Sequence, residues 1–103
     1  MEMLKNTDII ATNIRNLRQA TRCQIKILAW ACKVTPYFIK KWESGIGEIP
    51  EECVRVFARQ AVCTYDEFCS RIYSADEIVK ARMEREIKIT GSLHQRMRKK
   101  QNV

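Results

Sequence analysis

Apolar residues recur along this chain at intervals of three and four, which is the spacing of one face of an α-helix. No stretch shows the sustained alternation of a half-buried strand, and only three glycines and two prolines interrupt the pattern. The pattern predicts an all-α fold with five short helices. Their apolar positions, in chain order, are Ile10, Ile14 and Leu17; Ile25, Leu28, Ala29 and Cys32; Phe38, Ile39 and Trp42; Val54, Phe57, Ala58 and Ala61; Phe68 and Ile72.

Local signals place both ends of the third helix. Thr35 can act as its N-cap, and Pro36 suits the first helical position, where the missing N–H costs nothing. The helix should end at Ser44 and Gly45, because glycine readily adopts the left-handed conformation that follows a helix.

Two capping boxes mark the starts of the last two helices. Thr64 with Glu67, and Ser74 with Glu77, have the spacing that lets each side chain bond to the other's backbone N–H. The second box begins a longer amphipathic helix, which we place at 74–90. Its apolar positions are Ile78, Val79, Met83 and Ile87.

These elements divide the chain into three parts. Residues 1–73 should form the five-helix domain, 74–90 a C-terminal helix, and 91–103 a basic, flexible tail that begins where Gly91 ends the helix. Alternating acids and bases on 74–90 suit an exposed helix. Its apolar stripe can fold back on the domain or pair with a second copy of the chain, and we favour self-association.

The formal charge of +7 is distributed unevenly. Residues 10–44 hold seven basic residues and one acidic, residues 45–70 hold two basic and five acidic, and residues 71–103 hold nine basic and four acidic. Two positive stretches therefore flank an acidic one. Binding to a polyanion such as nucleic acid would explain the two positive stretches, because the polyanion would neutralise them. The competing explanation is that they form an ordinary solvated surface.

Several classes of protein have little support. The five cysteines form no C-x-x-C pair and only one histidine, His94, is present, so we expect no metal site and reduced thiols. Nucleophile motifs and glycine-rich phosphate loops are missing, so we expect no enzyme activity and no cofactor. No apolar run approaches the ~20 residues of a membrane span, and the N-terminus lacks a signal-peptide pattern. A cytoplasmic protein with no membrane partner is expected.

The second and third helices have the spacing of a helix-turn-helix pair, in which the second helix enters the major groove of DNA. Such a helix needs one apolar face as an anchor, which Val34, Phe38, Ile39 and Trp42 supply. Its other face carries the groups that can contact bases or phosphates. We assign DNA contacts here to Thr35, Pro36, Tyr37, Lys40, Lys41 and Ser44.

The motifs between Ile14 and Phe68 together resemble the Cro/C1-type (XRE-like) helix-turn-helix family of phage repressors and bacterial regulators. They are Ile14-Arg-Asn-Leu-Arg18, Leu28-Ala29, Val34-Thr35, Ile39, Trp42-Glu-Ser-Gly45 and Tyr65-Asp-Glu-Phe68. The stretch from Val34 to Cys53 looks closest to the Cro-like branch of YdaS and DicC regulators. The resemblance implies a five-helix λ-repressor-like domain with recognition residues at the start of the third helix.

This chain departs from the family pattern at two positions. The family usually has glutamine where this chain has Ile25, and we expect Gln24 to substitute for it. The family's turn usually has glycine where this chain has Lys33, and a non-glycine residue in a left-handed conformation costs ~1–2 kcal/mol. We therefore expect the turn to be reshaped.

Phosphate contacts are expected outside the third helix as well. Gln24 and Lys26 stand at the start of the second helix, whose N-terminus presents unpaired N–H groups. Four further basic residues are candidates for phosphate contacts: Arg15, Arg18, Arg22 and Lys33.

The sequence thus predicts a DNA-binding transcriptional regulator associated with the nucleoid. We expect a phage or prophage Cro-like repressor that binds a palindromic double-stranded operator as a homodimer or higher oligomer. Two alternatives stay open. One is an antitoxin-type protein whose C-terminal region binds a protein partner, and the other is a phage activator that contacts polymerase through acids such as Glu48, Glu51 and Glu52.

Overall fold

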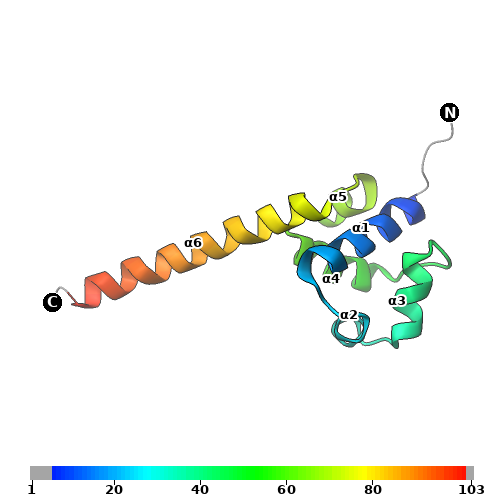
Figure 1. Cartoon of the computed structure of the whole chain (residues 1–103), viewed down its shortest axis with the longest axis horizontal. Helices are drawn as coiled ribbons and strands as arrows, with labels where there is room; N and C mark the ends of the chain where they lie inside the picture. Colours follow the sequence, from blue (N-terminus) through cyan, green and yellow to red (C-terminus); the bar gives the residue numbers. More distant parts are fainter. Residues whose placement is uncertain (1–5, 102–103) are drawn as a thin grey trace.

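A computed structural model describes residues 6–101 of the chain, with side chains described for 7–88. Residues 6–101 form six α-helices and contain no strand, which confirms the predicted all-α class (Figure 1). The helices are α1 (Asn6–Thr21), α2 (Ile25–Cys32), α3 (Pro36–Glu43), α4 (Glu51–Ala61), α5 (Tyr65–Ser70) and α6 (Ala75–Gln101).

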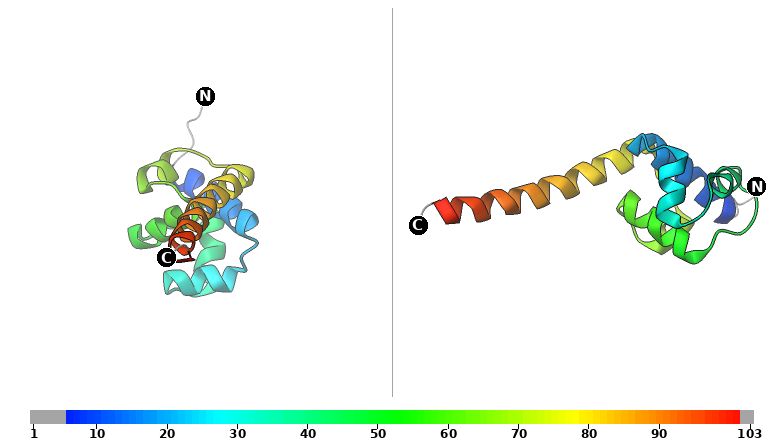
Figure 2. Two further views of the ribbon diagram at one scale, coloured as in Figure 1. Left: turned by 90° about the vertical axis from the view of Figure 1, so that its left-hand side faces the viewer. Right: turned by 90° about the horizontal axis from the view of Figure 1, so that it is seen from below.

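Helix α1 is at the centre of the arrangement, since it packs against α3, α4, α5 and α6. Helix α2 packs against α3 and α4, and α4 packs against α5. Helix α6 starts beside α1 and α4 and then runs away from the other five helices, as the right-hand view of Figure 2 shows. The first five helices therefore form a small bundle from which α6 projects.

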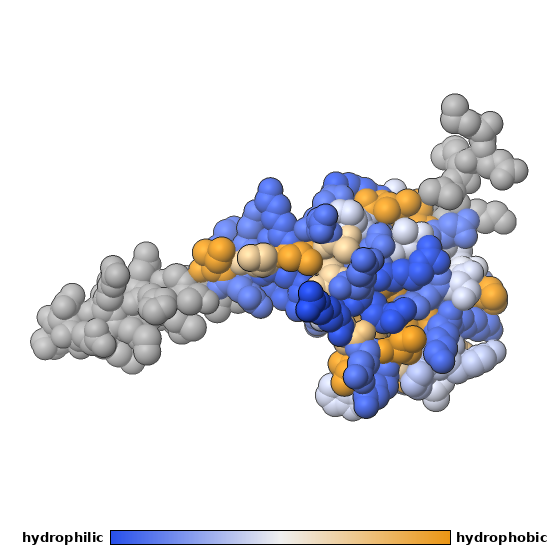
Figure 3. All heavy atoms as spheres, viewed as in Figure 1, coloured by the Kyte–Doolittle hydropathy of each residue, from blue (hydrophilic) through white to orange (hydrophobic). Residues whose placement is uncertain are grey.

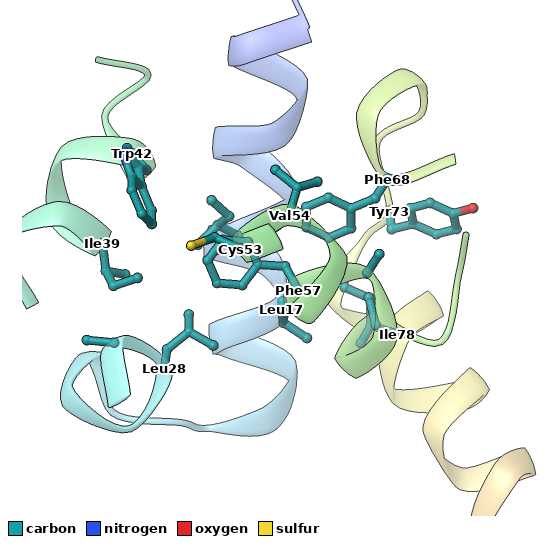
Figure 4. Packing of buried hydrophobic residues seen from close by; sticks show 14 residues of the cluster. Leu17, Leu28, Ile39, Trp42, Cys53, Val54, Phe57, Phe68, Tyr73 and Ile78 are labelled. Carbon is teal, nitrogen blue, oxygen red and sulfur yellow. The ribbon is translucent and has the colours of Figure 1, made fainter. Parts of the chain in front are cut away.

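Phe57 of α4 is at the centre of the hydrophobic core and is fully buried (Figure 4). Its ring centroid lies 6.4 Å from that of Trp42 on α3 and 6.3 Å from that of Phe68 on α5. Leu17 of α1 and Leu28 of α2 belong to the same buried cluster. The core therefore draws on all five short helices, as the apolar spacing predicted.

The core extends beyond residue 73, where we placed the end of the domain. Tyr73 and Ile78 are buried in the same cluster, and Ile78 is fully buried. The spacing wrongly assigned Ile72 to the core, because Ile72 is 40% exposed. Helix α5 ends at Ser70, so helical spacing does not govern Ile72, and the extended backbone that follows turns Tyr73 inward instead.

Helix α6 is longer than the predicted 74–90, because it continues through Gly91 to Gln101. A single glycine costs a helix about 1 kcal/mol relative to alanine, which good helix-forming neighbours can offset. The expected break at Gly91 was therefore wrong. The side chains of the predicted flexible tail, 91–103, lie outside the described residues.

The capping predictions are largely confirmed. The reciprocal hydrogen bonds of the capping box are present between Thr64 and Glu67 and between Ser74 and Glu77. Pro36 is the first residue of α3 and Thr35 is its N-cap, although within the described chain the Thr35 side chain makes no capping hydrogen bond.

Candidate nucleic-acid interface

Helices α2 and α3 are joined by a three-residue turn whose first residue, Lys33, is left-handed with φ of +59°. The Val34 N–H donates to the carbonyl of Ala29 at 3.0 Å, and the Lys33 N–H donates to that of Trp30 at 3.1 Å. These two bonds form a Schellman motif, which normally has glycine at the left-handed position. Lys33 thus keeps the left-handed geometry, and the reshaped turn that we expected is not observed.

Helix α3 is fixed to the domain by Ile39, which is fully buried, and Trp42, which is 3% exposed. Phe38 was predicted to belong to the same anchor but is 41% exposed. It lies on the flank of α3, where its ring packs at 5.9 Å from Trp42 and 5.6 Å from Tyr37. Two residues therefore form the buried anchor, and Phe38 covers its edge.

Most of the predicted DNA contacts of α3 are on its exposed side. Thr35, Pro36, Tyr37 and Lys40 are all exposed, and Tyr37 retains 66% of its accessible surface. Ser44 is exposed too, but its hydroxyl donates to the carbonyl of Lys40 at 3.0 Å. The structure therefore brings these residues together on one surface of a short, well-anchored helix.

Lys41 differs from Lys40 in its surroundings. It is half-buried, and its side chain runs close to Gly47. A Cβ built on Gly47, which has φ of +81°, would approach the Lys41 Cε to 3.2 Å. The loop after α3 therefore holds the aliphatic part of Lys41, while Lys40 extends freely into solvent.

Helix α2 presents its N-terminus on the exposed surface. Gln24 is its N-cap residue, and both Gln24 and Lys26 are exposed. The first N–H groups of a helix have no partners within the helix and attract anions. Both residues are therefore in positions from which a phosphate contact is possible.

Two of the four arginine and lysine candidates are engaged inside the domain. Arg18 pairs with Glu43 through two hydrogen bonds, from Nε to Oε1 at 2.7 Å and from Nη2 to Oε2 at 3.1 Å. Arg15 donates from Nη1 to the carbonyl of Glu43 at 2.8 Å. Both arginines tie α1 to the last residue of α3, so they position that helix. Arg22 and Lys33 are exposed, so both side chains are accessible to a phosphate, as the prediction requires.

Glu43 is the positioning residue that the sequence analysis missed. It is 8% exposed, although it is a charged residue at the end of an exposed helix. The signal was present: it is the one acid within residues 10–44, opposite two arginines spaced three apart on α1. A buried carboxylate requires such a partner.

Asn13 of α1 was also missed. It is fully buried, and its Nδ2 donates to the carbonyls of Phe68 at 2.8 Å and Arg71 at 2.7 Å. Its Oδ1 accepts from the N–H of Tyr73 at 2.7 Å. Nothing in the local sequence indicates these partners. Asn13 fixes α1 to the segment between α5 and α6.

All five cysteines are free of disulfide bonds in the structure. Burial, with a smaller effect of the nearby Cys53, raises the pKa of the Cys32 thiol to about 12. Burial likewise raises the pKa of Cys63 to about 11. Over side chains 7–88, no three histidine, cysteine or acidic residues cluster as metal ligands would.

Comparison of the chain with models of protein families, with curated proteins and with solved structures gave no match. None of the helices in the described part combines the length and apolar character that crossing a bilayer requires.

Proposed function

We propose that this protein is a sequence-specific, double-stranded DNA-binding regulator in which α2 and α3 form a helix-turn-helix and α3 is the recognition helix. The observation that carries the proposal is that α3 has one buried side and one exposed polar side. Its inner side is fixed by Ile39 and Trp42, while Tyr37 and Lys40 project from its outer side. A helix in the major groove needs this combination of a rigid base and exposed polar groups.

The electrostatics of the surroundings support the same function. Lys26, Lys33 and Arg22 are exposed on or beside α2, the helix that would cross the DNA backbone. Contacts of lysine and arginine to phosphates supply most of the non-specific affinity of DNA-binding proteins. We therefore assign affinity chiefly to these basic residues and sequence preference to Pro36 and Tyr37 with Lys40.

Within this class we propose a Cro-like repressor of a phage or prophage that binds a palindromic operator as a symmetric oligomer. Such a protein acts by occupying the operator and excluding RNA polymerase. The support is the sequence resemblance together with a bundle in which α2 and α3 lie away from the projecting part of α6 (Figure 1).

Selection from a randomised duplex library tests the proposal, with the selected motif then measured by gel shift. We expect a motif with two-fold symmetry. Lys40→Ala should weaken binding to it by about 1–3 kcal/mol and Lys41→Ala by less, because the loop already holds the stem of Lys41. Lys88→Ala on α6 is the matched control, since it removes the same charge from an exposed site away from α3.

Salt dependence separates the two kinds of contact. Lys26→Ala should lower the slope of log affinity against log salt concentration by about 1 for every selected sequence, as expected for a lost phosphate contact. Tyr37→Ala should instead change which bases are preferred. Failure to select any motif, or equal affinities for Lys40→Ala and Lys88→Ala, would contradict the recognition-helix assignment.

A further inference from the structure

Helix α6 carries an apolar stripe that the other described residues do not cover. Val79, Met83 and Ile87 follow one another at intervals of four residues and are 36%, 57% and 67% exposed. Figure 3 shows a row of hydrophobic residues along this part of α6. Exposure increases along the stripe because α6 leaves the bundle as it proceeds.

The domain holds α6 by other residues. Ile78 is buried in the core, and Arg82 donates from Nη1 to the carbonyl of Gln60 at 2.6 Å. Arg85 donates to the carbonyl of Arg59 at 3.4 Å. The apolar stripe is therefore on a side of α6 that the contacts with α4 leave open.

Charged residues flank the stripe in an ordered way. Successive residues of an α-helix are turned by about 100°, so Lys80 and Glu84 lie on one flank of Met83. Arg82 and Glu86 lie on the opposite flank. Each flank therefore carries one base and one acid, and the order of charge along the chain is the same on both.

We propose that a second copy of this chain covers the stripe, with the two α6 helices antiparallel and a two-fold axis beside Met83. The symmetry places the two Met83 side chains together and Val79 of each copy near the partner's Ile87. This interface would supply the two-fold symmetry of the proposed operator complex, but it does not depend on DNA.

The charges select the antiparallel direction. In an antiparallel pair, each flank faces the same flank of the partner. Measured parallel to the helix axes, Lys80 and the partner's Glu84 are then only about 3 Å apart. Glu86 faces the partner's Arg82 in the same way. In a parallel pair, opposite flanks face each other, which sets Lys80 beside the partner's Arg82 and Glu84 beside the partner's Glu86. The antiparallel pair has four attractive contacts where the parallel pair has repulsions.

Sedimentation equilibrium of the reduced full-length chain without DNA tests the interface. We expect a monomer–dimer equilibrium between micromolar and millimolar concentration. Met83→Lys should give a monomer over that range, because it places two like charges on the axis. Ile46→Lys is the matched control, since Ile46 is 56% exposed in the loop after α3 and its substitution should leave the mass unchanged.

Charge reversal tests the direction. Lys80→Glu should weaken the dimer about tenfold, because two symmetric pairs change from attraction to repulsion. Adding Glu84→Lys should restore it, while Lys88→Glu, on the far side of α6, should have little effect. A parallel dimer would instead be strengthened by Lys80→Glu.

The outcomes are distinct from those of the DNA-binding proposal. A wild-type chain that is monomeric at every concentration, a dimer that survives Met83→Lys, or strengthening by Lys80→Glu would each overturn the interface. Circular dichroism checks that the variants fold, and Ile87→Lys provides a second disruption at a more exposed site. Binding of Met83→Lys to a single half-site should be unchanged, so a failure of DNA binding is recognised separately.

Discussion

The carboxylate of Glu43 at the end of α3 accepts two hydrogen bonds from the guanidinium of Arg18 on α1, at 2.7 and 3.1 Å. The side chain of Glu43 is 10% exposed and that of Arg18 is 36% exposed, so the pair is only partly screened by water. It couples the proposed recognition helix to the centre of the bundle. The position of α3 therefore depends on a contact between residues 25 apart in sequence.

Glu43→Gln should destabilise the protein by about 1–2 kcal/mol, because it removes a bidentate, partly buried ion pair but keeps the shape of the side chain. Urea denaturation measures the change. Glu51→Gln is the control, since the pair of Glu51 with Arg55 is exposed on both sides and should contribute no more than about 0.5 kcal/mol. Equal effects of the two substitutions would show that Glu43 does not hold α3.

Asn13→Ala should cost about 2–4 kcal/mol in unfolding free energy, because it leaves two carbonyls and one N–H without their buried partner. Asn16→Ala is a suitable comparison. Asn16 makes one described bond, from Nδ2 to the carbonyl of Tyr73 at 2.8 Å, so its loss should cost about 1 kcal/mol. The proposed role of Asn13 predicts that its effect is clearly the larger.

Val62 ends α4 in a left-handed conformation with φ of +61°, which is unfavourable for a β-branched residue. Val62→Gly should therefore stabilise the protein by about 0.5–1 kcal/mol, after allowance for the greater freedom of glycine in the unfolded chain. Val62→Ala keeps a Cβ and should give no such gain. Thermal unfolding distinguishes them, and a glycine variant less stable than the alanine variant would refute the strain.

Glu67 should make the stability of the fold depend on pH in the acid range. Hydrogen bonds from Thr64, and then from the Tyr73 hydroxyl, hold the pKa of its carboxyl below the ordinary value. A carboxyl with a lowered pKa in the folded state stabilises the fold above its unfolded pKa. That contribution is lost as the pH falls through the folded pKa.

The stability of the wild type should therefore decrease as the pH falls below the ordinary pKa of glutamate. Glu67→Gln should flatten this decrease, and Tyr73→Phe should flatten it in part by removing one donor. Urea midpoints measured across the acid range test both. An unchanged acid slope in Glu67→Gln would show that another group is responsible.

Much of the secondary structure was predictable because its causes are local. The hydrogen bonds of the capping boxes at Thr64 and Ser74 span three residues, and Pro36 and the positive φ of Gly45 act within one turn. The exposed face of α3 followed from the same spacing. Ile72 lies after the end of α5, where helical spacing does not apply, so the prediction that Ile72 is buried was wrong.

The starts of the helices, most of their caps and the polar side of α3 depend on residues within about four positions of one another, so the pattern of residues was enough to predict them. The partner of each polar group depends instead on how the helices pack together. Arg18 meets Glu43, Asn13 meets the backbone 55 to 60 residues away, and Phe38 is left on an exposed flank. These contacts are set by how the helices pack in space, and spacing along the chain does not specify that packing.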